Sequence, residues 1–156
     1  MQSDKIKVTF YGNLYRNVKD WTDVEWNEVG EDNSGYISIE HPNIEGQRFP
    51  DEIVIPMNEI RVEYTYPLSK RTVMFFNADN ETGFTRAELA RKVCEGYQKI
   101  YQIEEEAVGN PGNLPGMLNR ATSEGPYGIW GHDIQDLVLH TVRQIDGNLF
   151  GLGVDS

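Results

Sequence analysis

The chain contains a single cysteine, Cys94, among its 156 residues. An intramolecular disulfide is therefore impossible, and a cysteine-rich zinc site is excluded. We expect a reducing, cytoplasmic compartment, because small proteins of oxidising compartments usually carry paired cysteines. Cys94 falls inside a predicted helix, so we interpret it as a small buried hydrophobe. A reactive thiolate favours a helix N-terminus or a basic neighbourhood.

Long hydrophobic runs and positive charge are also scarce. No stretch approaches the roughly 20 apolar residues that span a bilayer, and residues 1–5 show no secretory signal. The chain has 14 Lys and Arg against 25 Asp and Glu, a formal net charge of −11. Proteins that bind nucleic acids or anionic membranes need a basic face, so we expect neither partner.

Known catalytic and metal-binding motifs are missing as well. The sequence has no phosphate-binding Gly-x-x-x-x-Gly-Lys and no Gly-x-Ser-x-Gly turn. Its three histidines, His41, His132 and His140, are too widely spaced to form a His-x-His or His-x-x-x-His pair. We therefore expect neither a metal nor a cofactor.

Residues 30–41 superficially resemble a calcium loop of the EF-hand type. Asp32 and Ser34 fall on ligand positions when Gly35 takes the place of the loop glycine. The first position is then Gly30, which has no carboxylate, and the twelfth is His41, which cannot bind calcium as a bidentate glutamate does. We interpret the segment as an acidic turn before a strand.

The length and composition indicate one globular domain. A folded chain of this size buries roughly 70% of its unfolded surface, which is enough for a stable core without disulfides or a structural metal. Hydrophobic residues make up 38% of the chain and charged residues 25%, as in ordinary soluble proteins. We expect a single α+β domain over residues 1–156, with an antiparallel sheet of about five to seven strands packed on one long helix.

The clearest local signal is the start of that helix, predicted over residues 85–108. Thr85 can cap the first turn through its hydroxyl, and Glu88 can reach back to the Thr85 N–H, which would make a capping box. Phe84 and Leu89 stand where a hydrophobic staple would close around it. Gly109 and Pro111 end the helix.

The predicted helix carries one apolar stripe at the helical period: Leu89, Val93, Tyr97, Ile100 and Tyr101. Gly96 lies beside this stripe and predicts a close approach of the helix to the sheet, because a mid-helix glycine otherwise costs about 1 kcal/mol relative to alanine. Residues 104–106 are three glutamates at the helix end that the macrodipole disfavours. They indicate either a solvated helix end or a docking site for a basic partner.

Alternating apolar residues predict strands on both sides of the helix. A hairpin is expected from residues 61–66 and 72–77, and a second, C-terminal one from residues 137–145 and 149–154, joined by an Asp-Gly turn. A helix over residues 133–145 is the alternative to the second hairpin, since its apolar spacing also fits a helix. Further strands are expected at residues 5–11, 36–40 and 52–55.

Residues 109–126 are rich in glycine and proline and predict a long loop, with a short turn of helix at residues 117–121. The most site-like segment follows it at residues 127–133. Gly128 and Gly131 bracket Trp130, and His132 and Asp133 come next. Histidine is suited to proton transfer near neutral pH. The alternative is structural: the two glycines shape a turn, Trp130 closes the core edge and His132 makes a structural hydrogen bond.

Aromatic residues on the first hairpin suggest a partner surface. Tyr64, Tyr66, Phe75 and Phe76 are predicted to place aromatics on both of its faces, one of which should meet the helix. The other face is either exposed to a partner or covered by residues 12–35.

Two functions follow from these observations. The first is a non-enzymatic protein-interaction module or assembly subunit, which binds a protein partner or forms a homo-oligomer. Its expected contact residues are Tyr127, Trp130, Tyr64, Tyr66 and Phe76. The second is a small enzyme, for example a hydrolase, with His132 as acid or base and Asp133 or a distant carboxylate as its partner. The surroundings of His132 discriminate between them.

Overall fold

The computed structural model describes residues 4–11, 22 and 35–156 of the chain. The predicted covering segment at residues 12–35 therefore lies outside the described residues except at residues 22 and 35, and so do residues 30–34 of the calcium-like loop. In chain order the elements are β1 (Lys7–Thr9), β2 (Ile37–Ser38), β3 (Ile53–Ile55), β4 (Glu59–Tyr64), β5 (Thr72–Asn77), β6 (Phe84–Thr85), α2 (Arg86–Val108), the 3-10 turn η2 (Ile134–Asp136), β7 (Val138–Asp146) and β8 (Leu149–Asp155).

The fold is α+β, as the sequence predicts. The main sheet has six strands in the order β1-β7-β8-β4-β5, and β2 also pairs with β7. All its pairings are antiparallel except that of β4 with β8, which is parallel and makes the sheet mixed. β3 and β6 form a separate two-stranded sheet just before the helix.

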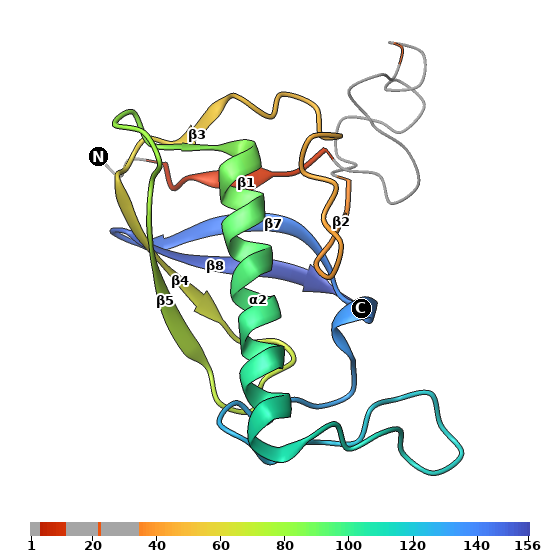
Figure 1. The fold of residues 1–156 in the computed structure, drawn as a ribbon. Helices are drawn as coiled ribbons and strands as arrows, with labels where there is room; N and C mark the ends of the chain where they lie inside the picture. Colours follow the sequence, from red (N-terminus) through yellow and green to blue (C-terminus); the bar gives the residue numbers. More distant parts are fainter. Residues whose placement is uncertain (1–3, 12–21, 23–34) are drawn as a thin grey trace.

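Helix α2 lies across one face of the main sheet and forms the core with it (Figure 1). The whole predicted stripe, from Leu89 to Tyr101, is buried. It meets buried sheet residues such as Ile60, Val62 and Phe150 in a single cluster. Each such side chain contributes about 1.5–3 kcal/mol when fully buried, so this helix–sheet interface supplies most of the hydrophobic stabilisation.

The ends of α2 agree with the sequence prediction, with one correction. Thr85 accepts the N–H of Glu88 at 3.0 Å, and Gly109 donates its N–H to the carbonyl of Glu105 at 2.8 Å. The second half of the predicted capping box is wrong. The Glu88 carboxylate points elsewhere, because it accepts the N–H of Asp79 at 2.7 Å and contacts the ammonium of Lys92.

Gly96 marks the closest approach of α2 to the sheet, which confirms the interpretation of this glycine. A Cβ atom at residue 96 would overlap the hydroxyl and ring of Tyr64 on β4. Tyr64 uses this space to donate its hydroxyl to the carbonyl of Val93 at 2.9 Å. The glycine therefore lowers the helix propensity of α2 but makes room for a buried hydrogen bond between the helix and the sheet.

The C-terminal hairpin is confirmed, and the alternative helix over residues 133–145 is wrong except for the single turn η2. β7 and β8 pair antiparallel around Gly147, which has a φ of 56°. The predicted helical turn at residues 117–121 is also wrong. A hairpin-like turn replaces it, in which Leu114 donates its N–H to the carbonyl of Asn119 at 2.8 Å.

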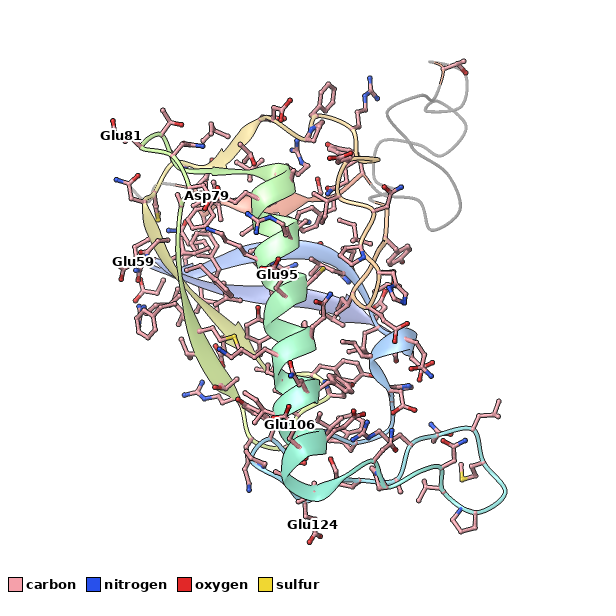
Figure 2. The ribbon with its side chains drawn as sticks, in the orientation of Figure 1. Glu59, Asp79, Glu81, Glu95, Glu106 and Glu124 are labelled. Atoms are coloured by element: carbon pink, nitrogen blue, oxygen red, sulfur yellow. The ribbon has the colours of Figure 1, made fainter. Side chains whose placement is uncertain are left out.

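None of the helices in the described part of the chain is long and apolar enough to cross a membrane. Acidic side chains line several exposed edges of the fold, including Asp79 and Glu81 before α2, Glu95 on its outer side and Glu106 near its end (Figure 2). The negative charge is thus spread over the surface instead of being gathered on one element.

We predict that Gly96→Ala destabilises the protein although alanine is the better helix former. The added methyl must displace Tyr64, and overpacking of this kind costs about 1–3 kcal/mol. Urea unfolding followed by circular dichroism measures the change. Lys99→Ala, at an exposed position of the same helix, is the matched control and should leave the unfolding free energy nearly unchanged. An equally stable Gly96→Ala variant would contradict the close packing.

Candidate functional site

The candidate site around His132 depends on a buried carboxylate, that of Glu104 near the end of α2. Glu104 has no exposed surface. It accepts the Ser123 hydroxyl at 2.5 Å and four backbone N–H groups at 2.8–3.3 Å, those of Gly125, Tyr127, Gly128 and Ile129. The loop after α2 is therefore wrapped around one side chain, and neither interpretation of the glutamate run applies to Glu104.

The charge of Glu104 is stabilised where it lies. Burial alone would raise the pKa of its carboxyl, but the hydrogen bonds from Ser123 and from the loop backbone outweigh burial and hold the pKa below its ordinary value of 4.5. A carboxylate that accepts several N–H groups is a strong acceptor. Glu104 is thus an ionised anchor for residues 123–129.

A second buried charge, Arg120, extends this network toward the site. Its guanidinium binds the carboxylate of Asp133 at 2.8 Å and the hydroxyl of Ser123 at 3.4 Å. The Asp133 side chain is thereby engaged by Arg120. Asp133, predicted as a partner of His132, instead fixes the segment that carries the histidine.

The His132 imidazole lies between a hydroxyl and a carboxylate. Its Nε2 atom is 3.0 Å from the Ser156 Oγ atom, and the Tyr66 hydroxyl shares a 2.7 Å hydrogen bond with the same Oγ. Its Nδ1 atom is 3.7 Å from a carboxylate oxygen of Asp136, which is longer than a hydrogen bond. That same oxygen accepts the N–H of Asp133.

Two hydrogen bonds hold this cluster against α2 and against the turn after β4. Tyr101 of α2 donates its hydroxyl to the carbonyl of His132 at 2.8 Å, and Trp130 donates its N–H to the carbonyl of Pro67 at 3.1 Å. The Trp130 ring, 40% exposed, packs edge-to-face on Tyr66 with centroids 5.3 Å apart. Residues far apart in the sequence thus form one surface cluster of Tyr66, Trp130, His132 and Ser156.

A small open pocket of about 270 Å³ lies beside this cluster. It is lined by Leu118, Asn119, Gly131, His132, Asp136 and Ser156. Gly128 and Gly131 have positive φ angles of 63° and 77°, which confirms that they shape the turn around Trp130. Leu118, from the tip of the loop, is 93% exposed, so the pocket is shallow on that side.

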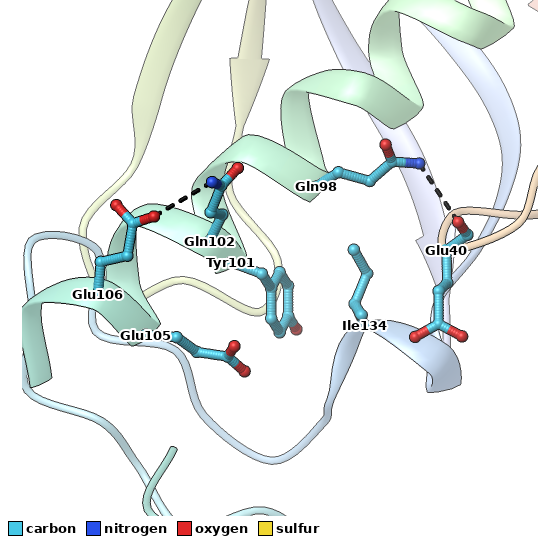
Figure 3. Close-up of a pocket in the computed structure, with 7 residues that line it drawn as sticks. All are labelled: Glu40, Gln98, Tyr101, Gln102, Glu105, Glu106 and Ile134. Atoms are coloured by element: carbon cyan, nitrogen blue, oxygen red, sulfur yellow. Dashed lines mark hydrogen bonds between the residues drawn. The ribbon is translucent and has the colours of Figure 1, made fainter. Parts of the chain in front are cut away.

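A larger open pocket of about 520 Å³ lies on the other side of η2 (Figure 3). Its lining is acidic and amide-rich, with Glu40, Glu105 and Glu106 around Gln98 and Gln102. Gln98 donates its amide to backbone carbonyls of residues 39 and 40, and Gln102 donates to Glu106. Among the described residues, no group of three or more His, Cys, Asp or Glu side chains is placed to hold a metal ion.

The remaining predicted contact residues are distributed between core and surface. Tyr64 is fully buried under α2, and Phe76 is partly buried on the same side of the sheet. Tyr127 is half-buried and contributes its backbone to the Glu104 anchor. Of the aromatics on the first hairpin, Phe75 is the one that faces outward, with 68% of its surface exposed.

Phe75 belongs to β5, which is an edge strand with an unpaired side. β5 pairs with β4, and no other described strand pairs with it. The N–H of Ala78 bonds to the carbonyl of Asn58 at 2.7 Å. Hydrogen-bonded positions alternate in an antiparallel pair. The backbone N–H and C=O groups of Phe76, Met74 and Thr72 therefore point toward β4. The backbone groups of residues 73, 75 and 77 therefore point away from the sheet.

This edge lacks the usual protection against other strands. Natural edges carry lysines, prolines or bulges, but β5 reads Thr-Val-Met-Phe-Phe-Asn with no charge and no proline. Val73, beside Phe75 on the outer face, is 40% exposed. The Lys92 ammonium binds the carbonyl of Asn77 at one end of the strand. With respect to the described residues, the groups without a backbone partner are thus both backbone groups of Val73 and Phe75 and the N–H of Asn77.

Sequence reasoning missed Ser156, Asp136, Glu104 and Arg120 as parts of the site. Asp136 had a usable signal, since it lies four residues after His132, the spacing at which side chains meet on one face of a helical turn. Glu104 had only an indirect signal, an acidic residue where the helix dipole disfavours it. Ser156 and Arg120 had none, because their partners are distant in sequence or outside regular structure.

No protein-family model, curated protein or solved structure matches this chain.

We predict that Glu104→Gln destabilises the protein by about 2–4 kcal/mol, because an amide cannot accept all five donors and places its own N–H groups against them. Urea unfolding at neutral pH measures the loss. The exposed neighbour Glu105 supplies the control, and Glu105→Gln should change the unfolding free energy little.

The destabilisation by Glu104→Gln should also depend on pH. The folded-state pKa of Glu104 is lowered, so its contribution is fully present above the ordinary value and is lost as the pH falls through the folded value. The stability difference between wild type and variant should therefore shrink in acid. A difference that stays constant from neutral to acidic pH would show that the charge of Glu104 is not responsible.

Proposed function

We propose that this chain is a protein-interaction module or assembly subunit that binds a partner strand along the free edge of β5. One observation carries the proposal: the outward backbone groups of residues 73, 75 and 77 coincide with the exposed side chains of Val73 and Phe75. Strand addition obtains affinity from main-chain hydrogen bonds and specificity from alternate side chains. This edge supplies both.

The composition of the outer face supports the same proposal. Val73 and Phe75 stand opposite Glu63 and Arg61 of β4, so an apolar strip is bordered by charges on one side. Arg71 reaches the Glu63 carboxylate at 2.8 Å. An apolar centre with a polar rim is the usual composition of a protein interface.

The geometry around His132 supports catalysis less well. A serine–histidine–carboxylate relay needs the carboxylate to hydrogen-bond the imidazole and hold its tautomer. Here Asp136 is 3.7 Å from Nδ1 and is already an acceptor for the Asp133 N–H. Ser156, for its part, shares its hydroxyl with Tyr66.

We predict that Phe75→Lys abolishes partner capture without unfolding the protein. The side chain is largely exposed, so lysine is tolerated there, and an edge lysine opposes the approach of another strand. Purified wild type and variant are used as baits in native extract, and the captured proteins are compared after each fold is checked by circular dichroism.

Two control baits sharpen this comparison. Leu118→Lys replaces a still more exposed apolar residue on the loop, and His132→Ala alters the other candidate site; both should capture the same proteins as wild type. If Phe75→Lys also retains them, or if wild type captures neither another protein nor its own chain, the β5 proposal fails.

A hydrolase is the second candidate, favoured by the 3.0 Å contact between the His132 Nε2 atom and the Ser156 hydroxyl beside a pocket. In this proposal His132 removes the hydroxyl proton as the Ser156 Oγ atom attacks an acyl carbon. The proton then passes to the departing alcohol, and water releases the acid from the acyl-serine. Apo contacts such as that of Asp136 often tighten only when substrate binds.

If the hydrolase proposal holds, a fluorophosphonate probe should label Ser156 of the wild-type chain, and His132→Gln should reduce the labelling rate by about 100-fold or more. Intact mass spectrometry with peptide mapping detects the adduct. Ser69→Ala, a control outside the cluster, should be labelled like wild type. Wild-type protein that stays unlabelled would exclude this function while leaving the β5 proposal intact.

A further inference from the structure

We infer that the strand bound at β5 is the β5 strand of a second copy of this chain, paired antiparallel around Phe75. This inference rests on the proposed function and names its partner. In this pairing Phe75 stands opposite the partner copy's Phe75, and Val73 stands opposite its Asn77. The result is a symmetric dimer whose two sheets continue into each other.

The hydrogen-bonding pattern selects this register. An antiparallel ladder forms only between residues whose backbone groups both point outward, which for β5 are residues 73, 75 and 77. Centring the two-fold axis on Phe75 matches all three with their counterparts. The Asn77 carbonyl, which already accepts the Lys92 ammonium, is then shared with the Val73 N–H of the second copy, as its two lone pairs allow. A register centred on Val73 or Asn77 leaves at least one of them without a strand partner.

Side-chain pairing in this register is favourable on both faces. On the outer face the two exposed Phe75 rings become cross-strand neighbours, and aromatic cross-strand pairs are more favourable than pairs of alanines. On the helix-facing side Met74 falls opposite Phe76 of the second copy, which extends the apolar layer. No two like charges are placed opposite each other within the strand, since β5 carries none.

The charges that flank the strand are complementary under the same symmetry. Arg71 and Asp79 each lie four residues from Phe75 in the sequence. Arg71 of each copy therefore comes near Asp79 of the other copy, which gives two such contacts in the dimer. Both side chains are largely exposed, and Figure 2 shows Asp79 near the start of α2, beyond the end of β5. Centring on Asn77 would instead bring Asp79 to Phe75 and Glu81 to Val73.

The opposite edge of the sheet explains why pairing stops at two copies. Two short strands pair with β7 at that edge, β1 with three residues and β2 with two. Lys7 lies on β1 with Lys5 just before it, and short strands and lysines are the usual protection of an edge. Lys5 also binds the carbonyl of Ile145 at 2.6 Å. Pairing through β5 is therefore isologous and closes on itself instead of propagating into a fibre.

The net charge of −11 on each copy opposes association. Because salt screens repulsion between exposed charges over roughly 10 Å at 0.1 M, the dimer should become tighter as the salt concentration rises. An interface that depended mainly on the Arg71–Asp79 contacts would weaken instead. The sign of the salt dependence thus separates apolar strand pairing from ion pairing.

Cysteine substitution tests both the partner and the register. Hydrogen-bonded antiparallel neighbours have Cα atoms about 5.5 Å apart, within the range of about 4.4–6.8 Å that a disulfide spans. Phe75→Cys should therefore form a covalent dimer under mild oxidation, seen by non-reducing electrophoresis. The native Cys94 is buried, and burial raises the pKa of its thiol to about 12, so the wild type supplies a silent background.

Mixing single variants fixes the register. Val73→Cys alone and Asn77→Cys alone should give little covalent dimer under oxidation, whereas their equimolar mixture should form a mixed disulfide. Leu118→Cys, on the exposed loop, controls for random collision and should give no more dimer than wild type. Equal cross-linking of every variant would overturn the register.

Light scattering coupled to size exclusion supplies the measurement on unmodified protein. A wild-type dimer that Phe75→Lys converts to monomer supports the inference. A wild type that is monomeric at every concentration overturns self-pairing; if it still captures another protein through Phe75, the interaction function survives. A dimer that persists in Phe75→Lys and lacks the Phe75→Cys cross-link lies on another face and overturns the inference.

Discussion

The buried carboxylate of Glu104 is the interaction on which the whole end of the molecule around His132 depends. Five donors from residues 123–129 converge on it, and Arg120 continues the network to Asp133. The loop between α2 and β7 has almost no regular structure of its own. The Glu104 carboxylate therefore accepts the backbone N–H groups that the neighbouring strand of a sheet would otherwise accept. The positions of Trp130 and His132 follow from it.

Local signals were enough to predict the elements that pack the core. The bounds of α2 follow from Thr85 and Gly109, and both hairpins follow from alternation and turn chemistry. These signals act over a few residues, and in each case the apolar pattern of the segment agrees with the tertiary packing. The role of Gly96 could also be inferred, because a glycine in mid-helix needs a compensating contact.

The candidate sites could be predicted only in part, because they are assembled from distant residues. The segment from Tyr127 to Asp133 was recognisable by composition, yet Asp133 binds Arg120 and the imidazole meets Ser156. The exposure of the Phe75 side chain was only one of two alternatives. The alternation of residues along a strand assigns each side chain to a face of the sheet, but it does not tell which face is covered. The parallel pairing of β4 with β8 carries no local signal at all.

That parallel pairing has a consequence for synthesis of the chain. β7 and β8 occupy the middle of the sheet but come last in the sequence. While the chain emerges from the ribosome, β1 and the β4–β5 hairpin lack the strands that join them, so the sheet cannot close before β8 is made. Until then the hairpin exposes a second open edge on β4. Between the synthesis of β5 and that of β8, the chain therefore has more open strand edges than the folded protein.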